Sequence, residues 1–266
     1  MYETRYHRPK DIAEAAKIFS GAAEARYLAG GQTLLPTMKQ RLAAPTDVID
    51  VRRLSELKGI TVSGEAVTIG AATTHAEVHS ADAVKKAIPA LAQLAGLIGD
   101  PAVRHMGTIG GSLANNDPAA DYPAAVMALN AAIKTDKRTI AAEDFFQGLF
   151  ATALEPGELI VSVSFPIPAK AAYAKFDNPA SRYAMAGVFV AKLKDGAVRV
   201  GVTGAHGDGV FRATEIERAL TSSWSPEAVE TVTISPEGML SDIHGSAAYR
   251  ANLVKVMAKR AVAAAP

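Results

Sequence analysis

The chain contains no cysteine, and this absence excludes several kinds of site. None of its 266 residues offers a thiolate that could hold an iron–sulfur cluster, ligate zinc, form a disulfide or act as a nucleophile. An excess of one charge is also lacking, since 28 Lys and Arg stand against 27 Asp and Glu. A near-neutral chain has no general attraction for polyanions, so nucleic acid and anionic membranes are poor candidate partners.

Long apolar runs and catalytic signatures are missing as well. No segment is apolar over the length that a bilayer requires, and the polar residues 1–6 do not resemble a signal core, so we expect a cytoplasmic protein without a transmembrane segment. The histidines do not have metal-ligand spacing, and there is no Gly-x-Ser-x-Gly elbow. We therefore expect no metal site and no catalytic nucleophile in this chain.

Two glycine pairs, about 80 residues apart, are the most informative feature that is present. They lie in residues 29–33 (Ala-Gly-Gly-Gln-Thr) and 108–112 (Thr-Ile-Gly-Gly-Ser). Paired glycines allow positive φ and a close approach of the backbone to a ligand. Successive N–H groups in such a turn form an anion-binding concavity, to which hydroxyls add donors. Because neither segment contains Lys or Arg, we expect two glycine loops that converge on a permanently bound diphosphate.

Each segment also has a purely structural interpretation. The first is compatible with a simple strand-to-helix turn, and it matches neither the G-x-G-x-x-G fingerprint nor a phosphate loop ending in Gly-Lys-Ser/Thr. The second is compatible with a glycine-rich turn before a helix whose N-cap is Asp121. The many Asn, Asp, Ser and Thr residues in 104–121 favour a polar cleft wall that hydrogen-bonds a ribityl, ribose or adenine group.

The element pattern predicts an α+β fold with a change of architecture along the chain. A strand–glycine loop–helix–strand order over residues 26–51 predicts a small parallel unit with the loop at the carboxyl end of its strand. A hairpin over 60–69 and an edge-type strand over 159–165 predict a mixed or antiparallel sheet. A hairpin over 187–202, followed by three helical segments, predicts a C-terminal α+β module. We expect domains over 1–170, with subdomains of about 1–56 and 57–170, and over 171–266.

Further motifs accompany the glycine pairs: residues 117–123 (Asp-Pro-Ala-Ala-Asp-Tyr-Pro), 158–160 (Glu-Leu-Ile) and 173–176 (Tyr-Ala-Lys-Phe). With these motifs the chain resembles, over nearly its full length, the flavoprotein (medium) subunit of molybdenum hydroxylases. This is the family of aerobic carbon monoxide dehydrogenase and of the flavin domain of xanthine dehydrogenase. The resemblance implies a two-subdomain FAD-binding fold, with FAD held noncovalently between a parallel piece and a mixed piece, followed by a C-terminal α+β module.

The resemblance also implies which residues bind FAD. The first loop would wrap the diphosphate, the second would contribute a hydroxyl and backbone, Asp121 would lie near the adenosine end, and Lys175 would approach the isoalloxazine region. Ile98 and Ile160 would pack on the flavin or adenine. The implied set is Leu28, Ala29, Gly30, Gly31, Gln32, Thr33, Leu34, Ile98, Thr108, Gly111, Ser112, Asp121, Ile160, Lys175 and Tyr183.

One position departs from the family. Arg182 stands where relatives often have an acidic residue before an aromatic–alanine pair, so no role of that carboxylate is carried over. The adjacent Tyr183 remains the candidate for stacking near the flavin ring.

The missing cysteines then bear on assembly. Molybdenum hydroxylases need iron–sulfur clusters held by cysteine thiolates, and this chain has none. The resemblance therefore implies a hetero-oligomer with an iron–sulfur small subunit and a molybdopterin large subunit. The leading hypothesis is an FAD-carrying electron-transfer subunit that passes electrons from partner clusters to an external acceptor. Two alternatives remain: a standalone FAD-dependent oxidoreductase, and a flavin-binding assembly module without a redox role.

Overall fold

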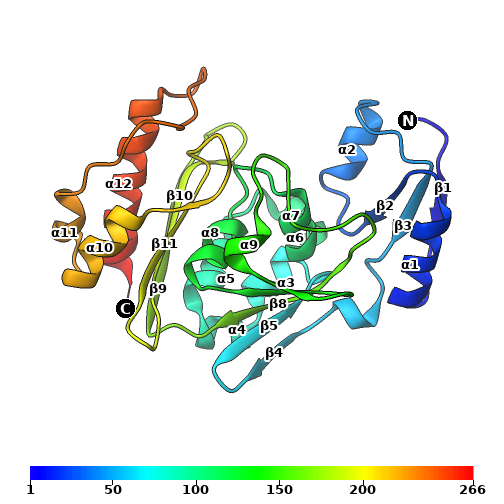
Figure 1. The fold of residues 1–266 in the computed structure, drawn as a ribbon, viewed down its shortest axis with the longest axis horizontal. Coiled ribbons are helices and arrows are strands. Elements are labelled where there is room, and N and C mark those ends of the chain that lie inside the picture. The colour runs from blue at the N-terminus through cyan, green and yellow to red at the C-terminus, as the bar shows by residue number, and fades with distance from the viewer. Residues whose placement is uncertain (266) are drawn as a thin grey trace.

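Three sheets, each formed by its own stretch of chain, organise the computed structural model, which describes residues 1–265. Figure 1 shows the three sheets in chain order along the long axis, with the N-terminus near one end and the C-terminus near the other. Among the described residues no helix has the length and apolar character needed to cross a membrane. The mixture of a parallel sheet, antiparallel sheets and helices confirms the predicted α+β class.

The N-terminal unit is a small parallel sheet, as predicted. Its strands β1 (Arg5–His7), β2 (Ala25–Leu28) and β3 (Asp47–Asp50) run parallel in the order β1-β3-β2, and helices α1 (Ile12–Gly21) and α2 (Leu34–Lys39) connect them. Asp11 begins α1 by accepting a hydrogen bond from the Glu14 backbone N–H (2.7 Å). The first glycine segment leaves the carboxyl end of β2 and leads into α2.

The central unit contains a five-stranded antiparallel sheet. Its elements are the 3₁₀ helix η1 (Ser55–Leu57), which precedes the sheet, and the strands β4 (Ile60–Ser63), β5 (Ala66–Gly70), β6 (Ala132–Thr135), β7 (Thr139–Ala141) and β8 (Ile160–Pro166). The strand order is β4-β5-β8-β6-β7, so β8 pairs on both sides. The prediction of β8 as an edge strand is therefore wrong. Its alternating pattern arises because one face is buried while the other is half-exposed.

Short helices connect these strands. They are α3 (His75–Ser80), α4 (Asp82–Ala87), α5 (Pro89–Gly96), α6 (Pro101–Met106), α7 (Ile109–Asn115), α8 (Tyr122–Ala128) and α9 (Ala142–Phe145). Local chemistry fixes where several of them begin. Thr74 and Glu77 form a capping box at the start of α3, and Asp100 caps α6 with Pro101 in its first turn.

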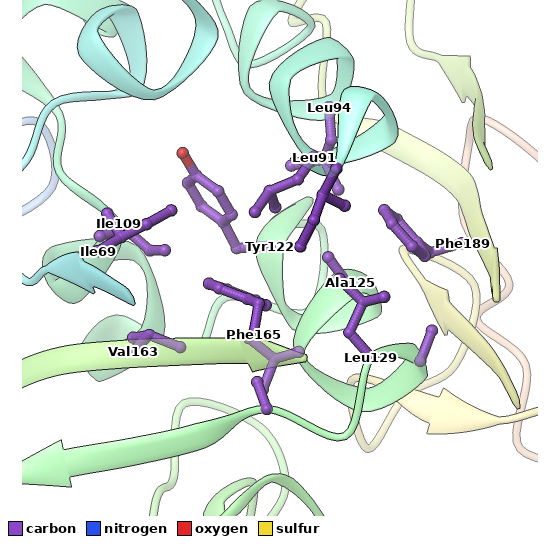
Figure 2. Close-up of a cluster of buried hydrophobic side chains, with 14 of the residues drawn as sticks. Ile69, Leu91, Leu94, Ile109, Tyr122, Ala125, Leu129, Val163, Phe165 and Phe189 are labelled. Atoms are coloured by element: carbon purple, nitrogen blue, oxygen red, sulfur yellow. The ribbon is translucent and has the colours of Figure 1, made fainter. Parts of the chain in front are cut away.

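The main core lies where α5 and α8 meet the central sheet. Figure 2 shows Leu91 and Leu94 of α5 together with Tyr122 of α8 and Phe165 of β8. Phe189 belongs to the C-terminal sheet and yet closes this same cluster, in which it is fully buried. The C-terminal sheet is therefore packed onto the central unit through a shared apolar core.

The C-terminal unit is an antiparallel sheet covered by helices, as predicted. Its strands are β9 (Lys170–Asp177), β10 (Ala184–Lys192), β11 (Val198–Thr203) and β12 (Phe211–Arg212), in the order β12-β11-β10-β9. Its helices are α10 (Thr214–Ser222), α11 (Pro226–Glu230) and α12 (Ala247–Ala264). These helices cover the face of the sheet that is turned away from the central unit (Figure 1).

Candidate cofactor-binding cleft

A cleft of about 660 Å³ runs between the N-terminal sheet and the helices of the central unit and reaches the C-terminal sheet. Gly31 contributes from the loop after β2, Gly111 from α7 and Tyr183 from the β9–β10 loop. The lining combines backbone, hydroxyl groups and apolar side chains such as Ile98 and Ile160. This size and composition are typical of a small-molecule or cofactor site.

The first glycine segment forms an open loop of backbone donors. Gly31 has φ +71°, in the left-handed region that favours glycine. Within residues 1–265, no protein acceptor takes a hydrogen bond from the backbone N–H groups of residues 30–34. A Cβ on Gly30 would lie 2.1 Å from the Met106 carbonyl oxygen, so glycine is required for the close approach of this loop to α6. The segment thus presents consecutive unpaired donors, the arrangement expected for an anion-binding turn.

The second glycine segment differs from the prediction, because it is the first turn of α7 and not a loop. Thr108 is the N-cap, and its hydroxyl accepts from the Gly111 N–H (3.1 Å). The N–H groups of Ile109 and Gly110 donate to carbonyls of residues 73 and 71, and that of Ser112 donates to residue 108. The expected second set of free backbone donors is therefore absent from this described segment.

Gly111 nevertheless shapes the cleft. A Cβ built on it would meet only the Thr108 hydroxyl oxygen at 3.0 Å and the Ala29 Cβ at 3.9 Å. Gly110 differs, because its Cβ would lie 2.6 Å from the Cβ of Ala71, the residue that follows β5. Gly110 therefore serves packing, while Gly111 leaves space that a bulkier residue would take from the cleft.

Asp121 does not cap α8, contrary to the structural interpretation of the sequence. Its buried carboxylate accepts a hydrogen bond from the Tyr173 hydroxyl (2.6 Å) and pairs with the Lys175 ammonium (3.0 Å). Lys175 also donates to the Leu97 carbonyl (3.1 Å). Burial raises the pKa of Asp121, while the charge of Lys175 and the Tyr173 hydrogen bond act in the opposite direction. The pair links β9 to α8 at the side of the cleft.

Most of the residues expected from the sequence line this one cleft. They are Leu28, Ala29, Gly30, Gly31, Gln32, Thr33, Leu34, Ile98, Gly111, Ser112, Asp121, Ile160 and Tyr183. Thr108 and Lys175 are not part of the lining. Thr108 is buried as the cap of α7, and the Lys175 side chain is buried against Asp121.

The β9–β10 loop places Arg182 and Tyr183 on the cleft. Arg182 has φ +62°, unusual for a residue with a Cβ, and Asn178 supports the loop by accepting from the N–H groups of residues 180 and 181. Tyr183 is 56% exposed. Partial burial and the charges of Asp117 and Asp121 raise the pKa of Tyr183, so its hydroxyl stays protonated at neutral pH.

The lining residues that sequence reasoning missed include two with titratable side chains, Glu158 and His75. The Glu158 carboxylate accepts from Arg138 Nε (3.0 Å) and from the Thr135 hydroxyl (2.7 Å). The hydrogen bond from Arg138 is the main cause that lowers the pKa of Glu158 to about 2. No local motif indicates this pairing, because Arg138 lies 20 residues away in the chain.

Part of the polar run at residues 104–121 is structural. Asn116 has φ +44° at the end of α7, and its side-chain amide donates to the carbonyls of Gly148 and Ala151 (both 2.8 Å). Asn115 and Asp117, on either side of it, do line the cleft. The prediction of a polar cleft wall therefore holds for the neighbours of Asn116 and not for Asn116 itself.

This cleft has a loop of free backbone amides and apolar side chains in its lining, which are the features that a dinucleotide cofactor with a diphosphate requires. Residues 2–168 match the family described as "FAD binding domain in molybdopterin dehydrogenase". The chain belongs to this family, and its cofactor is FAD.

Individual relatives of the same kind match nearly the whole chain. The chain is 35% identical to the carbon monoxide dehydrogenase medium chain of Afipia carboxidovorans, over 97% of this chain and 94% of the relative. It is 36% identical to the glyceraldehyde dehydrogenase medium chain of Sulfolobus acidocaldarius, over 97% of each. A solved structure of reconstituted CO dehydrogenase from Oligotropha carboxidovorans superposes with a TM-score of 0.91 at 35% identity, covering 99% of this chain and 98% of the other. The protein is thus similar to FAD-binding medium subunits of molybdenum hydroxylases.

Proposed function

We propose that this chain is the electron-transfer subunit of a multi-subunit molybdenum hydroxylase and that its FAD lies in the cleft described above. The observation that carries the proposal is the row of unpaired backbone N–H groups at residues 30–34, with Gly31 at positive φ. Bound FAD supplies the redox chemistry, taking up electrons and delivering them to an acceptor. The protein binds, orients and shields it.

The residues of the cleft have distinct proposed roles. The amides of residues 30–34 donate to the diphosphate, where a fixed cradle of N–H groups binds negative charge without a Lys or Arg. Ser112 adds a hydroxyl donor, and Gly111 leaves the space beside it. Ile98 and Ile160 pack against the aromatic parts of FAD. Tyr183, exposed and neutral, stacks on the flavin ring.

The proposed roles of Thr108, Asp121 and Lys175 are structural, because these residues hold the walls of the cleft in place. Thr108 fixes the start of α7, and the Asp121–Lys175 pair fixes β9, and with it the loop that carries Tyr183, against α8. The two charges largely neutralise each other, so this pair holds the wall of the cleft without adding net charge to it.

We propose that electrons reach this flavin from an iron–sulfur subunit, which receives them from a molybdopterin subunit, and that the complex works in the cytoplasm. The chain has no cysteine to hold a cluster, and the relatives are named as medium chains. We also propose a functional division near residue 170, between the last strand of the central sheet and the first of the C-terminal sheet.

The test is co-expression with candidate iron–sulfur and molybdopterin chains from the same organism. The expected result is one complex on size-exclusion chromatography, with one FAD per medium chain and a flavin that the complex's substrate reduces. Separate elution of the loaded chains would contradict the partners. Substrate turnover by the isolated chain with FAD alone would favour a standalone oxidoreductase instead.

A further inference from the structure

The charged side chains that line the cleft are those of Arg26, Asp117, Asp121, Glu158 and Arg182. Three of them, Arg26, Asp121 and Glu158, each pair with a group of opposite charge. Their partners are, in the same order, Glu24 (3.3 Å), Lys175 (3.0 Å) and Arg138 (3.0 Å). The charge of these three lining residues is therefore already compensated within the protein.

The two other charged side chains of the lining have no such partner. Within residues 1–265, neither Asp117 nor Arg182 forms an ion pair. The Asp117 carboxylate accepts a hydrogen bond from the Ala119 N–H (2.8 Å). Among the described residues that line the cleft, Arg182 is thus the one cation that no carboxylate of the protein compensates.

The β9–β10 loop fixes the backbone of Arg182 at the cleft. The Arg182 N–H donates to the Asn178 carbonyl (2.8 Å), and the Asn178 N–H donates to the Tyr183 carbonyl (2.8 Å). Asn178 is buried, and its side-chain oxygen accepts from the N–H groups of residues 180 and 181. These hydrogen bonds hold Arg182 at φ +62°, which a residue with a Cβ adopts only when its surroundings impose it. The guanidinium therefore extends from a fixed point on the cleft.

Bound FAD would bring negative charge into this cleft. Oxidised FAD carries that charge on its diphosphate, and the loop at residues 30–34 offers backbone N–H groups but contains no Lys or Arg. Moving a charged group out of water is costly unless opposite charge lies nearby. Arg182 can supply this charge without giving up an ion pair of its own, whereas Arg26 is already paired with Glu24.

We propose that Arg182 is the cation that compensates the negative charge of the FAD diphosphate and so strengthens FAD binding. The inference rests on the proposed placement of FAD in this cleft. Asp117, the other unpaired charge of the lining, has the wrong sign for this role. Because Arg182 is exposed to solvent, dissolved ions screen its charge, and its contribution falls as the salt concentration rises.

The test is Arg182→Gln in the full-length protein, with the Kd for FAD measured by flavin fluorescence at two salt concentrations. At about 0.02 M NaCl the Kd is expected to rise roughly three- to tenfold, because the compensating charge is lost. At about 0.5 M NaCl the rise is expected to shrink below about twofold. The FAD-free variant is expected to melt within about 2 °C of the wild type, since Arg182 is exposed and unpaired.

Three matched variants separate charge from shape. Arg182→Lys keeps the charge and is expected to keep the Kd at low salt within about twofold of the wild type. Arg182→Glu reverses the charge and is expected to raise the Kd more than Arg182→Gln does. Arg26→Gln removes a cation of the same cleft that is paired with Glu24, and it is expected to change the Kd less than Arg182→Gln.

Two fragments of the cofactor show which part of FAD responds to Arg182. ADP carries a diphosphate and no flavin, while riboflavin carries the flavin ring and no phosphate. Arg182→Gln is expected to weaken the binding of ADP, measured by titration calorimetry, and to leave that of riboflavin unchanged. An equal loss for riboflavin would mean that Arg182 contributes shape and not charge, and it would overturn the inference.

An unchanged Kd for FAD in Arg182→Gln at low salt also overturns the inference, as does a rise of the same size at both salt concentrations. Gly111→Ala, measured in parallel, separates this inference from the proposed function. If Gly111→Ala weakens FAD binding and Arg182→Gln does not, the role of Arg182 is wrong and the cleft remains the FAD site. If neither variant weakens FAD binding, FAD lies elsewhere and both proposals fall.

Discussion

At Gly111, which lines the cleft, a Cβ would meet only the Thr108 hydroxyl oxygen at 3.0 Å and the Ala29 Cβ at 3.9 Å. The residue lies in the first turn of α7, where alanine is favoured over glycine by about 1 kcal/mol. We therefore expect Gly111→Ala to keep or raise the melting temperature of the FAD-free protein. We expect the added methyl to weaken FAD binding about tenfold, because a well-packed site resists an extra carbon. Calorimetry and a fluorescence titration on the same sample check both.

Gly30→Ala is the matched control, because its Cβ would lie 2.1 Å from the Met106 carbonyl oxygen. It should destabilise the FAD-free protein by roughly 1–3 kcal/mol, since the loop and α6 must separate. A Gly111→Ala protein that melts early and binds FAD normally would show that glycine serves folding at both positions, and it would remove Gly111 from the site.

Single residues also show what the sequence can and cannot predict. Gly31 was predictable because a glycine between a strand and a helix is typical of a turn with positive φ, which the structure has. Gly110 and Gly111 look like a second loop in the sequence, although they belong to a helix. The sequence does not show why glycine is needed there: Gly110 packs closely against Ala71, and Gly111 leaves space in the cleft. The sequence allows Asp121 both as a helix cap and as a residue of the cofactor site. It does not indicate the partners Tyr173 and Lys175, because they come from a strand more than 50 residues away.

Among the elements, the β6–β7 turn and the start of β8 are joined by Glu158. Its folded pKa of about 2 lies below its ordinary value of 4.5, so its ion pair stabilises the protein fully above about pH 4.5, and this contribution is lost as the pH falls towards 2. Because Arg138 is partly exposed to solvent, we expect a contribution of only roughly 1–3 kcal/mol.

Urea unfolding of the FAD-free protein at pH 6 and pH 3 checks this contribution. The wild type should lose more stability between the two pH values than Glu158→Gln, which has no carboxylate at this position. Equal losses in the two proteins would mean that the carboxylate is not held by Arg138 as the structure has it.

The Asp121–Lys175 pair joins α8 to β9. A double-mutant cycle measures the free energy of interaction between the two side chains. Lys175→Met leaves a buried carboxylate without its cation and should destabilise the protein by roughly 3 kcal/mol. Asp121→Asn/Lys175→Met removes both charges and should be markedly more stable than the sum of the two single changes predicts. Additive effects within about 0.5 kcal/mol would contradict a direct interaction.

Elements were predicted best where their signals are local. The hairpin predicted over residues 60–69 is the β4–β5 pair, and the hairpin predicted over residues 187–202 is the β10–β11 pair. The place of β8 in its sheet was not predictable, because alternation reports which face is buried and not how many strands pair with it. Strand order depends on partners such as β5 and β6, which lie far away in the sequence.

For the whole molecule, the sequence predicted the succession of a parallel unit, an antiparallel unit and a C-terminal module. It did not predict that the core continues across the proposed boundary near residue 170. Phe189 of β10 is buried in the same cluster as Leu91 and Phe165 of the central unit. The cleft is likewise lined by residues from the N-terminal, central and C-terminal units. Its form therefore depends on how the whole chain folds and not on a single motif.

The central claim is that FAD lies in this cleft with its diphosphate on the loop after β2. A crystal structure of the FAD-loaded protein tests it most directly. We expect diphosphate oxygens within hydrogen-bond distance of the backbone N–H groups of residues 31–33, with Gly111 and Ser112 bordering the cofactor. A diphosphate bound away from this loop, with these N–H groups still facing solvent, would contradict the account.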